Sequence, residues 1–223
     1  MISTDPDGVI WFATTAGLSR YDPNTVITFT MADGLPVNRI RGSARGRDGQ
    51  LWFSSPRGLI LWNGTGFQTF GKRNLLPDDD IQDIAELADG SICIATSKGV
   101  SLFDGVTTRN LSAPREVAQR IVCVGVAQDG TIAAGTHQAE LIQWRDPRLE
   151  PTVTQIPNIK SRYIRSILCL SSNEVWMGFE NGGGVIRSIA RPRPDGTLAV
   201  EHTQFDKENG LDDDYGSAMG RDA

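Results

Sequence analysis

The chain has 223 residues, 39% of them apolar, and is therefore long enough to bury a substantial core. Its net charge of −5 comes from interspersed residues of both signs, which excludes the basic stripe of a nucleic-acid binder. No segment approaches the roughly 20 continuous apolar residues of a membrane helix, and residues 1–4 carry no secretory signal pattern.

A unit of about forty residues recurs along almost the whole chain. Successive units open 41, 41, 40 and 43 residues apart, at Asp7, Asp48, Asp89, Asp129 and Ser172. A further unit starts at residue 222 and is cut short. This period is that of a propeller blade, whereas helical repeats would space their apolar residues by three and four. We therefore expect an all-β chain, with residues 1–223 forming a single β-propeller of about five four-stranded antiparallel blades.

The second unit shows how the strands of a blade are expected to follow one another. Residues 40–45 predict a first strand, and Asp48 and Gly49 form the turn after it. A second strand over 51–54 ends at a loop closed by glycine, as at Gly17, Gly58, Gly99 and Gly182 in the respective units. Residues 59–62 and 67–70 predict the third and the outer strand.

Two columns of the repeat predict the core. Four residues after the anchors stand Trp11, Trp52, Cys93, Ala133 and Trp176. Eight residues before the last four anchors an isoleucine stands each time, at positions 40, 81, 121 and 164. This regular placement favours tryptophans packed between blades over a sugar-stacking platform. The three cysteines fall in strands, where we expect free, buried thiols and neither disulfides nor a zinc site.

Both ends of the chain fall inside a repeat. Only six residues precede Asp7, too few for the strand that precedes the other anchors, so we expect the first blade to be incomplete. The segment 191–196, rich in proline and arginine, predicts an exposed loop inserted in the fifth unit. Because each blade needs neighbours to cover its faces, we expect an incomplete ring and a fragment of a longer protein.

The units resemble the two-component regulator propeller repeat. The second unit reads Asp-Gly-Leu-Pro-Val-Asn-Arg-Ile over 33–40 and Asp-Gly-Gln-Leu-Trp-Phe-Ser-Ser over 48–55, followed by Gly58 and Leu59. Ile-Trp-Phe-Ala-Thr over 10–14 and Val-Trp-Met-Gly over 175–178 agree in part. The third and fourth units depart from the pattern, with Cys93 and Ala133 in place of tryptophan and Ala139–Glu140 in place of Gly-Leu.

The resemblance implies a function. In that family the propeller is typically the periplasmic, ligand-sensing part of a membrane-bound histidine kinase or related signalling protein. It implies a periplasmic or extracellular location, and the missing blades and signalling domains of a parent protein as partners. Arginine and lysine among the carboxylates of the expected rim suggest a small-molecule ligand that is anionic or rich in hydroxyls, such as an oligosaccharide with acidic groups.

Chain direction predicts where a ligand would touch. In a four-stranded meander, the loop between the second and third strands and the loop to the next blade leave the same face of the disc. Polar side chains on such a rim form the default ligand site. The candidates are Asn38, Arg39, Arg57, Asp79, Lys98, His137, Arg162, Tyr163, Glu180 and Asn181.

We predict no catalytic residues, no cofactor and no metal site. The acidic runs 78–80 and 212–214 lack the alternating spacing of a calcium loop. The two histidines, His137 at the rim and His202 in an outer strand, are placed too differently to cooperate. A lyase of the streptogramin lyase type and a protein-interaction scaffold remain as alternatives to a ligand sensor.

Overall fold

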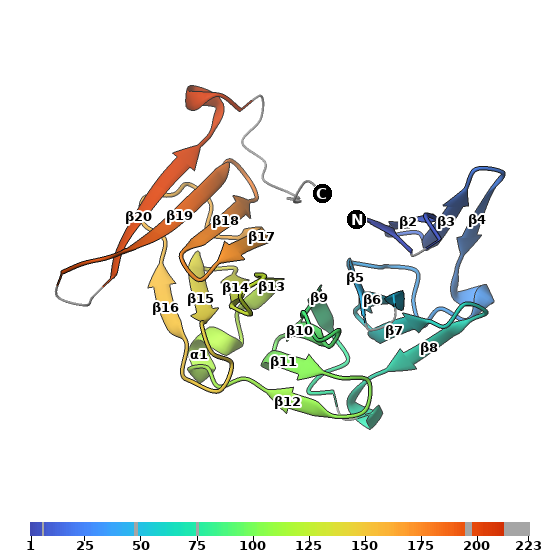
Figure 1. The fold of residues 1–223 in the computed structure, drawn as a ribbon. Coiled ribbons are helices and arrows are strands. Elements are labelled where there is room, and N and C mark those ends of the chain that lie inside the picture. Colours follow the sequence, from blue (N-terminus) through green and yellow to red (C-terminus); the bar gives the residue numbers. More distant parts are fainter. Residues whose placement is uncertain (6, 47–48, 75, 195–197, 212–223) are drawn as a thin grey trace. The chain divides into compact units, whose positions relative to one another are not determined.

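A computed structural model describes residues 1–5, 7–46, 49–74, 76–194 and 198–211. The residues in these ranges fold into five four-stranded antiparallel sheets, each built from four consecutive strands (Figure 1). Two compact units are distinguished, Met1–Leu111 (unit 1) and Ser112–Ala223 (unit 2). Unit 1 holds three of the sheets and unit 2 the other two, which confirms the predicted all-β blades.

The sheets of unit 1 follow the repeat. Sheet 1 consists of β1 (Ile2–Thr4), β2 (Ile10–Ala13), β3 (Leu18–Asp22) and β4 (Thr25–Phe29). Sheet 2 consists of β5 (Gly42–Arg45), β6 (Leu51–Ser55), β7 (Gly58–Trp62) and β8 (Phe67–Phe70). Sheet 3 consists of β9 (Ile81–Glu86), β10 (Ile92–Thr96), β11 (Gly99–Phe103) and β12 (Thr108–Asn110). Single-turn helices η1 (Met31–Asp33) and η3 (Lys72–Asn74) lie between successive sheets.

The sheets of unit 2 have the same strand order. Sheet 4 consists of β13 (Ile121–Val126), β14 (Ile132–Thr136), β15 (Glu140–Trp144) and β16 (Thr152–Gln155), preceded by the short helix α1 (Arg115–Ala118). Sheet 5 consists of β17 (Ile164–Ser171), β18 (Glu174–Phe179), β19 (Val185–Pro192) and β20 (Leu198–Phe205), followed by η4 (Lys207–Asn209).

Two sequence expectations about the strands were wrong. The first sheet is not short of a strand, because Ile2–Thr4 pairs in antiparallel register with β2. The Met1 ammonium adds a hydrogen bond to the Ala13 carbonyl at 3.1 Å, so three residues suffice for the strand. The insertion near residue 191 is exposed but is not simply a loop, because β19 continues to Pro192, paired with Leu198. The inserted residues therefore lengthen the β19–β20 hairpin.

The position of the loop glycine was also misassigned in the fifth unit. Gly17, directly before β3, and Gly58, the first residue of β7, have φ of 145° and 128°, and each lies close to the last residue of the outer strand. Gly184, with φ of 65°, takes that place beside Phe205 in sheet 5, whereas Gly182 lies within the hairpin. In sheet 4 the position belongs to Ala139, which adopts a left-handed φ of 62° that a side chain rarely tolerates.

Within unit 1, neighbouring sheets pack against each other through aromatic side chains. Trp11 of sheet 1 lies 5.8 Å from Phe53 and 5.2 Å from Trp62 of sheet 2, measured between ring centroids. Trp52 of sheet 2 repeats the arrangement at 5.8 Å from Phe103 of sheet 3. Both tryptophans are buried, as the column predicted. The isoleucine column is buried as well, and the three cysteines are free and buried.

Trp176, the last tryptophan of the column, is less buried than Trp11 and Trp52. In unit 2, sheets 4 and 5 pack through a cluster that includes Ile164, Met177 and Phe179. Trp176 alternates with these residues along β18 and points to the opposite face of sheet 5, where it is only partly buried. The sequence therefore predicted the position of Trp176 in its strand correctly, but it overestimated how deeply the side chain is buried.

Candidate functional site

A hollow of about 680 Å³ opens in unit 1 where sheet 2 is followed by sheet 3. Its walls come from the β6–β7 hairpin, the end of β8 and the loop that leads to β9. They are formed by Pro56, Arg57, Thr69, Gly71, Arg73 and Asp79. The β6–β7 hairpin and the loop between sheets were predicted to lie on the same rim. In this unit Arg57 and Asp79, one from each, line the same hollow.

Local hydrogen bonds hold the walls of this hollow. The Arg57 backbone N–H donates to Ser55 Oγ at 3.1 Å, and that hydroxyl donates to the Gly58 carbonyl at 2.8 Å. Asp79 accepts a hydrogen bond from the Lys72 backbone N–H at 2.7 Å, which fixes the start of η3. The Arg57 and Arg73 side chains form no ion pair within the part of the chain that the structure describes, so both cations face solvent and the hollow.

The acidic run beside the hollow is already bonded to protein groups. Asp78 pairs with Lys72 at 2.9 Å and accepts a hydrogen bond from Ser97 at 3.1 Å. Burial raises the pKa of Asp78, but the bonds from Lys72 and Ser97 outweigh it and leave the pKa below its ordinary value. Asp80 pairs with Arg41 at 2.6 Å. The second run, at 212–214, lies outside the described residues.

A second hollow, of about 500 Å³, occupies the equivalent place in unit 2. Gln138 stands nine residues after its anchor, as Arg57 does, and Arg162 stands ten residues before its anchor, as Asp79 does. The walls comprise Gln138, Ala139, Gln155, Ile156, Pro157, Asn158, Ile159 and Arg162. Two wall residues, Ala139 and Asn158, have positive φ of 62° and 56°, a departure that often marks functional sites.

A partly buried ion pair is bonded to the wall of the second hollow. Glu140 takes the place of the leucine in the Gly-Leu pattern and is buried, with its carboxylate 3.3 Å from the Arg120 guanidinium and accepting from Thr136 Oγ1 at 3.1 Å. Arg120 also donates to the Gln138 side-chain carbonyl at 2.5 Å. Gln155 donates to the carbonyls of Gln138 and Ala139 at 3.0 and 3.1 Å. The hairpin at the rim is thus held from two sides.

The other predicted rim residues have varied surroundings. His137 is exposed, with its ring 6.5 Å from that of Tyr163, and Glu180 pairs with Arg165 at 3.2 Å. Asn181 lies in the β18–β19 hairpin with φ of 53°. Lys98 and Arg39 are exposed and line neither hollow. Asn38 accepts a hydrogen bond from the Met31 backbone at 2.8 Å, which gives it a structural task.

Sequence reasoning missed Arg73 and Gln155, which line the hollows. The basic pair at 72–73 was the available signal for Arg73, because it falls in the same inter-sheet loop as Asp79. No column of the repeat singles out Gln155, whose place in the wall depends on where β16 ends.

A Ser–His contact also went unforeseen. Ser188 Oγ and His202 Nδ1 lie 2.6 Å apart as cross-strand neighbours of β19 and β20. Ser188 is buried, and burial lowers the pKa of His202. With only 4% of its surface exposed, Ser188 lies within the sheet and not at either hollow.

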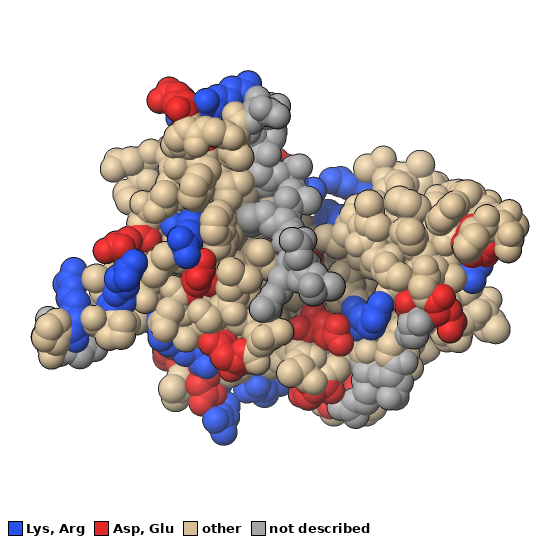
Figure 2. Space-filling model, turned by 45° about the horizontal axis from the view of Figure 1, so that its top comes forward, with Lys and Arg blue, Asp and Glu red and all other residues tan. Residues whose placement is uncertain are grey.

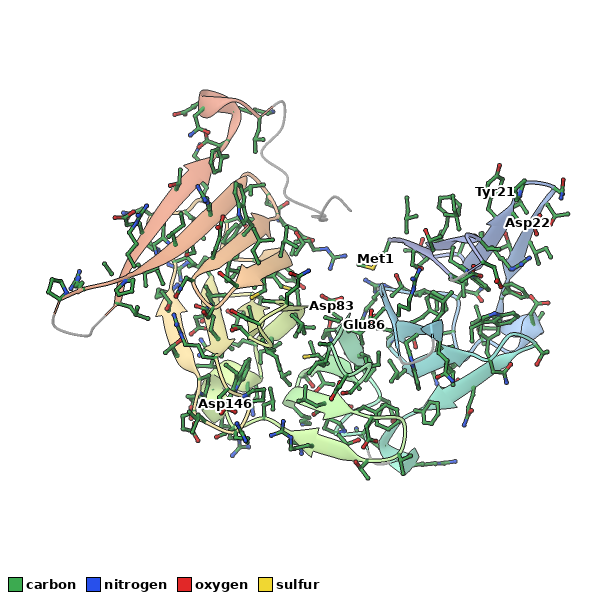
Figure 3. The ribbon with its side chains drawn as sticks, viewed as in Figure 1. Met1, Tyr21, Asp22, Asp83, Glu86 and Asp146 are labelled. Carbon is green, nitrogen blue, oxygen red and sulfur yellow. The ribbon has the colours of Figure 1, made fainter. Side chains whose placement is uncertain are left out.

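Two further acidic residues of unit 1 lie on one strand. Asp83 and Glu86 lie on β9, the first strand of sheet 3 (Figure 3). Burial raises the pKa of Glu86, and Arg45 partly counteracts this.

Lysine, arginine and acidic side chains alternate over the face seen in Figure 2 and form no large patch of one sign there. In the described ranges no cluster of histidine, cysteine, aspartate and glutamate is arranged to hold a metal ion.

No family model matches the chain, and no curated protein matches it. It is similar to the extracellular domain of the hybrid two-component system BT3049 from B. thetaiotaomicron, with 20% identity and a TM-score of 0.72, over 99% of this chain and 30% of that one. It is also similar to the extracellular domain of the system BT4673 from the same organism, with 16% identity and a TM-score of 0.68, over 93% of this chain and 30% of that one.

A third similar structure belongs to an enzyme. Virginiamycin B lyase from Staphylococcus aureus matches with 14% identity and a TM-score of 0.70, over 92% of this chain and 69% of the lyase. At these identities the likenesses show the fold alone, a β-propeller. The chain spans about a third of the length of the two extracellular domains. None of the helices among the described residues has the length and apolar character to span a membrane.

Proposed function

We propose that this chain is a ligand-binding propeller module of a two-component signalling protein and that it works outside the cytoplasm. The observation that carries the proposal is the recurrence of a polar hollow at the equivalent place of two repeats. Each hollow has in its wall an exposed arginine, Arg57 or Arg162, that forms no ion pair with the residues that the structure describes. The similarity to extracellular domains of two-component systems supports the same function.

The side chains of the hollows suggest the ligand class. Arg57 and Arg73 in one hollow and Arg162 in the other offer planar donors that suit carboxylate, sulfate or phosphate groups. Gln138 and Thr69 add neutral hydrogen-bonding groups that suit hydroxyls. We expect a small anionic or hydroxyl-rich ligand, such as an oligosaccharide with acidic groups.

Binding is favoured over catalysis by the placement of the two histidines. His202 is bonded to Ser188 in the middle of a sheet, while His137 lies in the β14–β15 hairpin. Neither histidine lines a hollow, so neither is positioned as a general base for a ligand bound there.

A ligand screen tests the proposal. Acidic and neutral sugars would be screened by thermal shift, and hits would be measured by calorimetry against Arg57→Ala, Arg73→Ala and Arg162→Ala. Loss of a charge-assisted bond should weaken binding roughly tenfold or more. Arg148→Ala, in the exposed β15–β16 loop, is the matched control and should bind normally.

Three results would overturn the proposal. They are the absence of any ligand, an affinity that all three arginine variants leave unchanged, or turnover of a ligand that depends on His137.

A further inference from the structure

The outward face of sheet 1 is apolar and uncovered. Along β1 to β4, Ile2 pairs with Phe12, and Ile10 pairs with Tyr21, which in turn pairs with Val26. These five side chains therefore lie on one face, opposite to Trp11. Ile2 and Val26 are each 66% exposed, Tyr21 is 42% exposed and Phe12 is 36% exposed. Figure 3 shows Tyr21 near the end of β3, beside Asp22.

The same positions are covered in the next repeat. Phe12 corresponds to Phe53, and Tyr21 corresponds to Trp62, because each is the same number of residues from its anchor. In sheet 2 these two rings receive Trp11 from sheet 1, and Phe53 has no exposed surface. In sheet 3 the equivalent of Tyr21 is Phe103, which receives Trp52. Phe12 and Tyr21 thus offer an exposed surface of the kind that contacts a tryptophan ring in the next repeat.

Sheet 5 carries the complementary half of this interface. Trp176 stacks on Phe205 of its own sheet at 5.5 Å. Trp11 and Phe29, at 6.0 Å, and Trp52 and Phe70, at 5.4 Å, are the equivalent pairs inside sheets 1 and 2. In those two sheets the pair contacts an aromatic ring of the following sheet, with Phe29 5.4 Å from Trp62 and Phe70 5.4 Å from Phe103.

The arginine over Trp176 is compatible with docking. Arg187 lies 5.5 Å from the indole and pairs with Glu174 at 2.8 Å. Arg20 has the same cross-strand place beside Trp11 and stays 29% exposed in the formed interface between sheets 1 and 2. Arg187 therefore need not leave the indole for a neighbouring sheet to approach.

We propose that the outward face of sheet 1 is a docking surface for the Trp176 face of sheet 5 in a second copy of this chain. The contact would repeat the interface between sheets 1 and 2, with Trp176 and Phe205 set against Phe12 and Tyr21. Because one face meets a different face, the association is heterologous.

The test uses one blocked face at a time. Wild-type chain should associate as its concentration rises in sedimentation velocity, and the total tryptophan emission, to which Trp176 contributes, should shift to the blue. Phe12→Glu and Trp176→Glu should each weaken self-association roughly 30-fold or more, as expected for loss of a central aromatic contact. An equimolar mixture of the two variants should form a heterodimer, because each retains the face that the other lacks.

Controls separate this result from misfolding and from general stickiness. Tyr21→Glu should reproduce the effect of Phe12→Glu, and both should keep the wild-type circular dichroism spectrum. Val106→Glu, at a residue 77% exposed in the β11–β12 turn, should associate like the wild type. A chain that stays monomeric at every concentration overturns the proposal. So does a pair of blocked variants that each still self-associate, or that fail to combine when mixed.

Discussion

Asn38 and Asp79 occupy the same place in successive repeats, and each accepts a hydrogen bond from the backbone N–H seven residues earlier. The donors are Met31, at 2.8 Å, and Lys72, at 2.7 Å, which begin the single-turn helices η1 and η3. The amide oxygen of Asn38 and the carboxylate of Asp79 accept the same hydrogen bond, which explains why either residue type fits this position in these two repeats.

The first prediction follows from this bond. Asn38→Ala and Asp79→Ala should each lower the free energy of unfolding by about 0.5–1.5 kcal/mol, the usual net value of one hydrogen bond. Asp79→Asn keeps the acceptor and should stay near the wild type. Urea denaturation measures the change, and faster amide exchange at Met31 or Lys72 locates it. Equal stability of the alanine and asparagine variants at 79 would contradict the assigned role.

The second prediction concerns the buried tryptophans. Trp52→Ala should lower the free energy of unfolding by roughly 3–5 kcal/mol, because it removes a large ring packed against Phe70 and Phe103. Trp176→Ala is the matched change at a partly exposed position and should cost clearly less. Denaturant unfolding compares the two variants. Equal losses would argue against the difference in burial described above.

The third prediction concerns the ion pair of sheet 4. Arg120→Ala alone should destabilise the protein, because it leaves the buried Glu140 carboxylate without its cation. Glu140→Leu restores the leucine of the Gly-Leu pattern, so Arg120→Ala combined with Glu140→Leu should be more stable than Arg120→Ala alone. A double-mutant cycle measured by urea unfolding gives the coupling energy. Additive effects would show that the two charges do not interact.

The fourth prediction is a pH dependence set by His202. Burial lowers its pKa in the folded state, so between the two pKa values the unfolded chain binds more protons than the folded one. Stability from this group is fully present above the ordinary histidine pKa of about 6.5 and is lost as the pH falls toward the folded value. Thermal unfolding should therefore show a decline below neutral pH that His202→Gln reduces. An unchanged slope in the variant would contradict the burial of this ring.

The repeat predicted the sheets because its columns encode strand register. Trp11 and Trp52 stand at the same position of equivalent strands, and a residue's place along a strand determines the face to which it points. The number of neighbouring sheets is not encoded in that column, so Trp176 was assigned to the core although its face is partly open. The strand Ile2–Thr4 was missed for a different reason, since no sequence pattern is resolvable in three residues.

The candidate site was harder to predict than the sheets. Arg57 and Asp79 were correctly placed near each other, because antiparallel topology brings their two loops to one edge. Arg73 reaches the wall of its hollow because of the turn of η3, and Gln155 reaches the wall of the other because of where β16 ends. Neither feature recurs with the period of the repeat, so the repeat does not predict them. Asn38 was grouped with the ligand contacts because a polar loop residue looks the same in sequence whether it binds a ligand or the backbone.

The aromatic interface that recurs among sheets 1, 2 and 3 also has a consequence for how such a gene can change length. Trp11 meets Phe53 and Trp62, and Trp52 meets Phe103 at the matching position one period later. A deletion of one 41-residue period between these two tryptophans would set the Trp11 side of one sheet against the Phe103 side of another. Recombination in register among these three repeats could therefore add or remove a whole sheet and still place a tryptophan against aromatic rings of the next sheet.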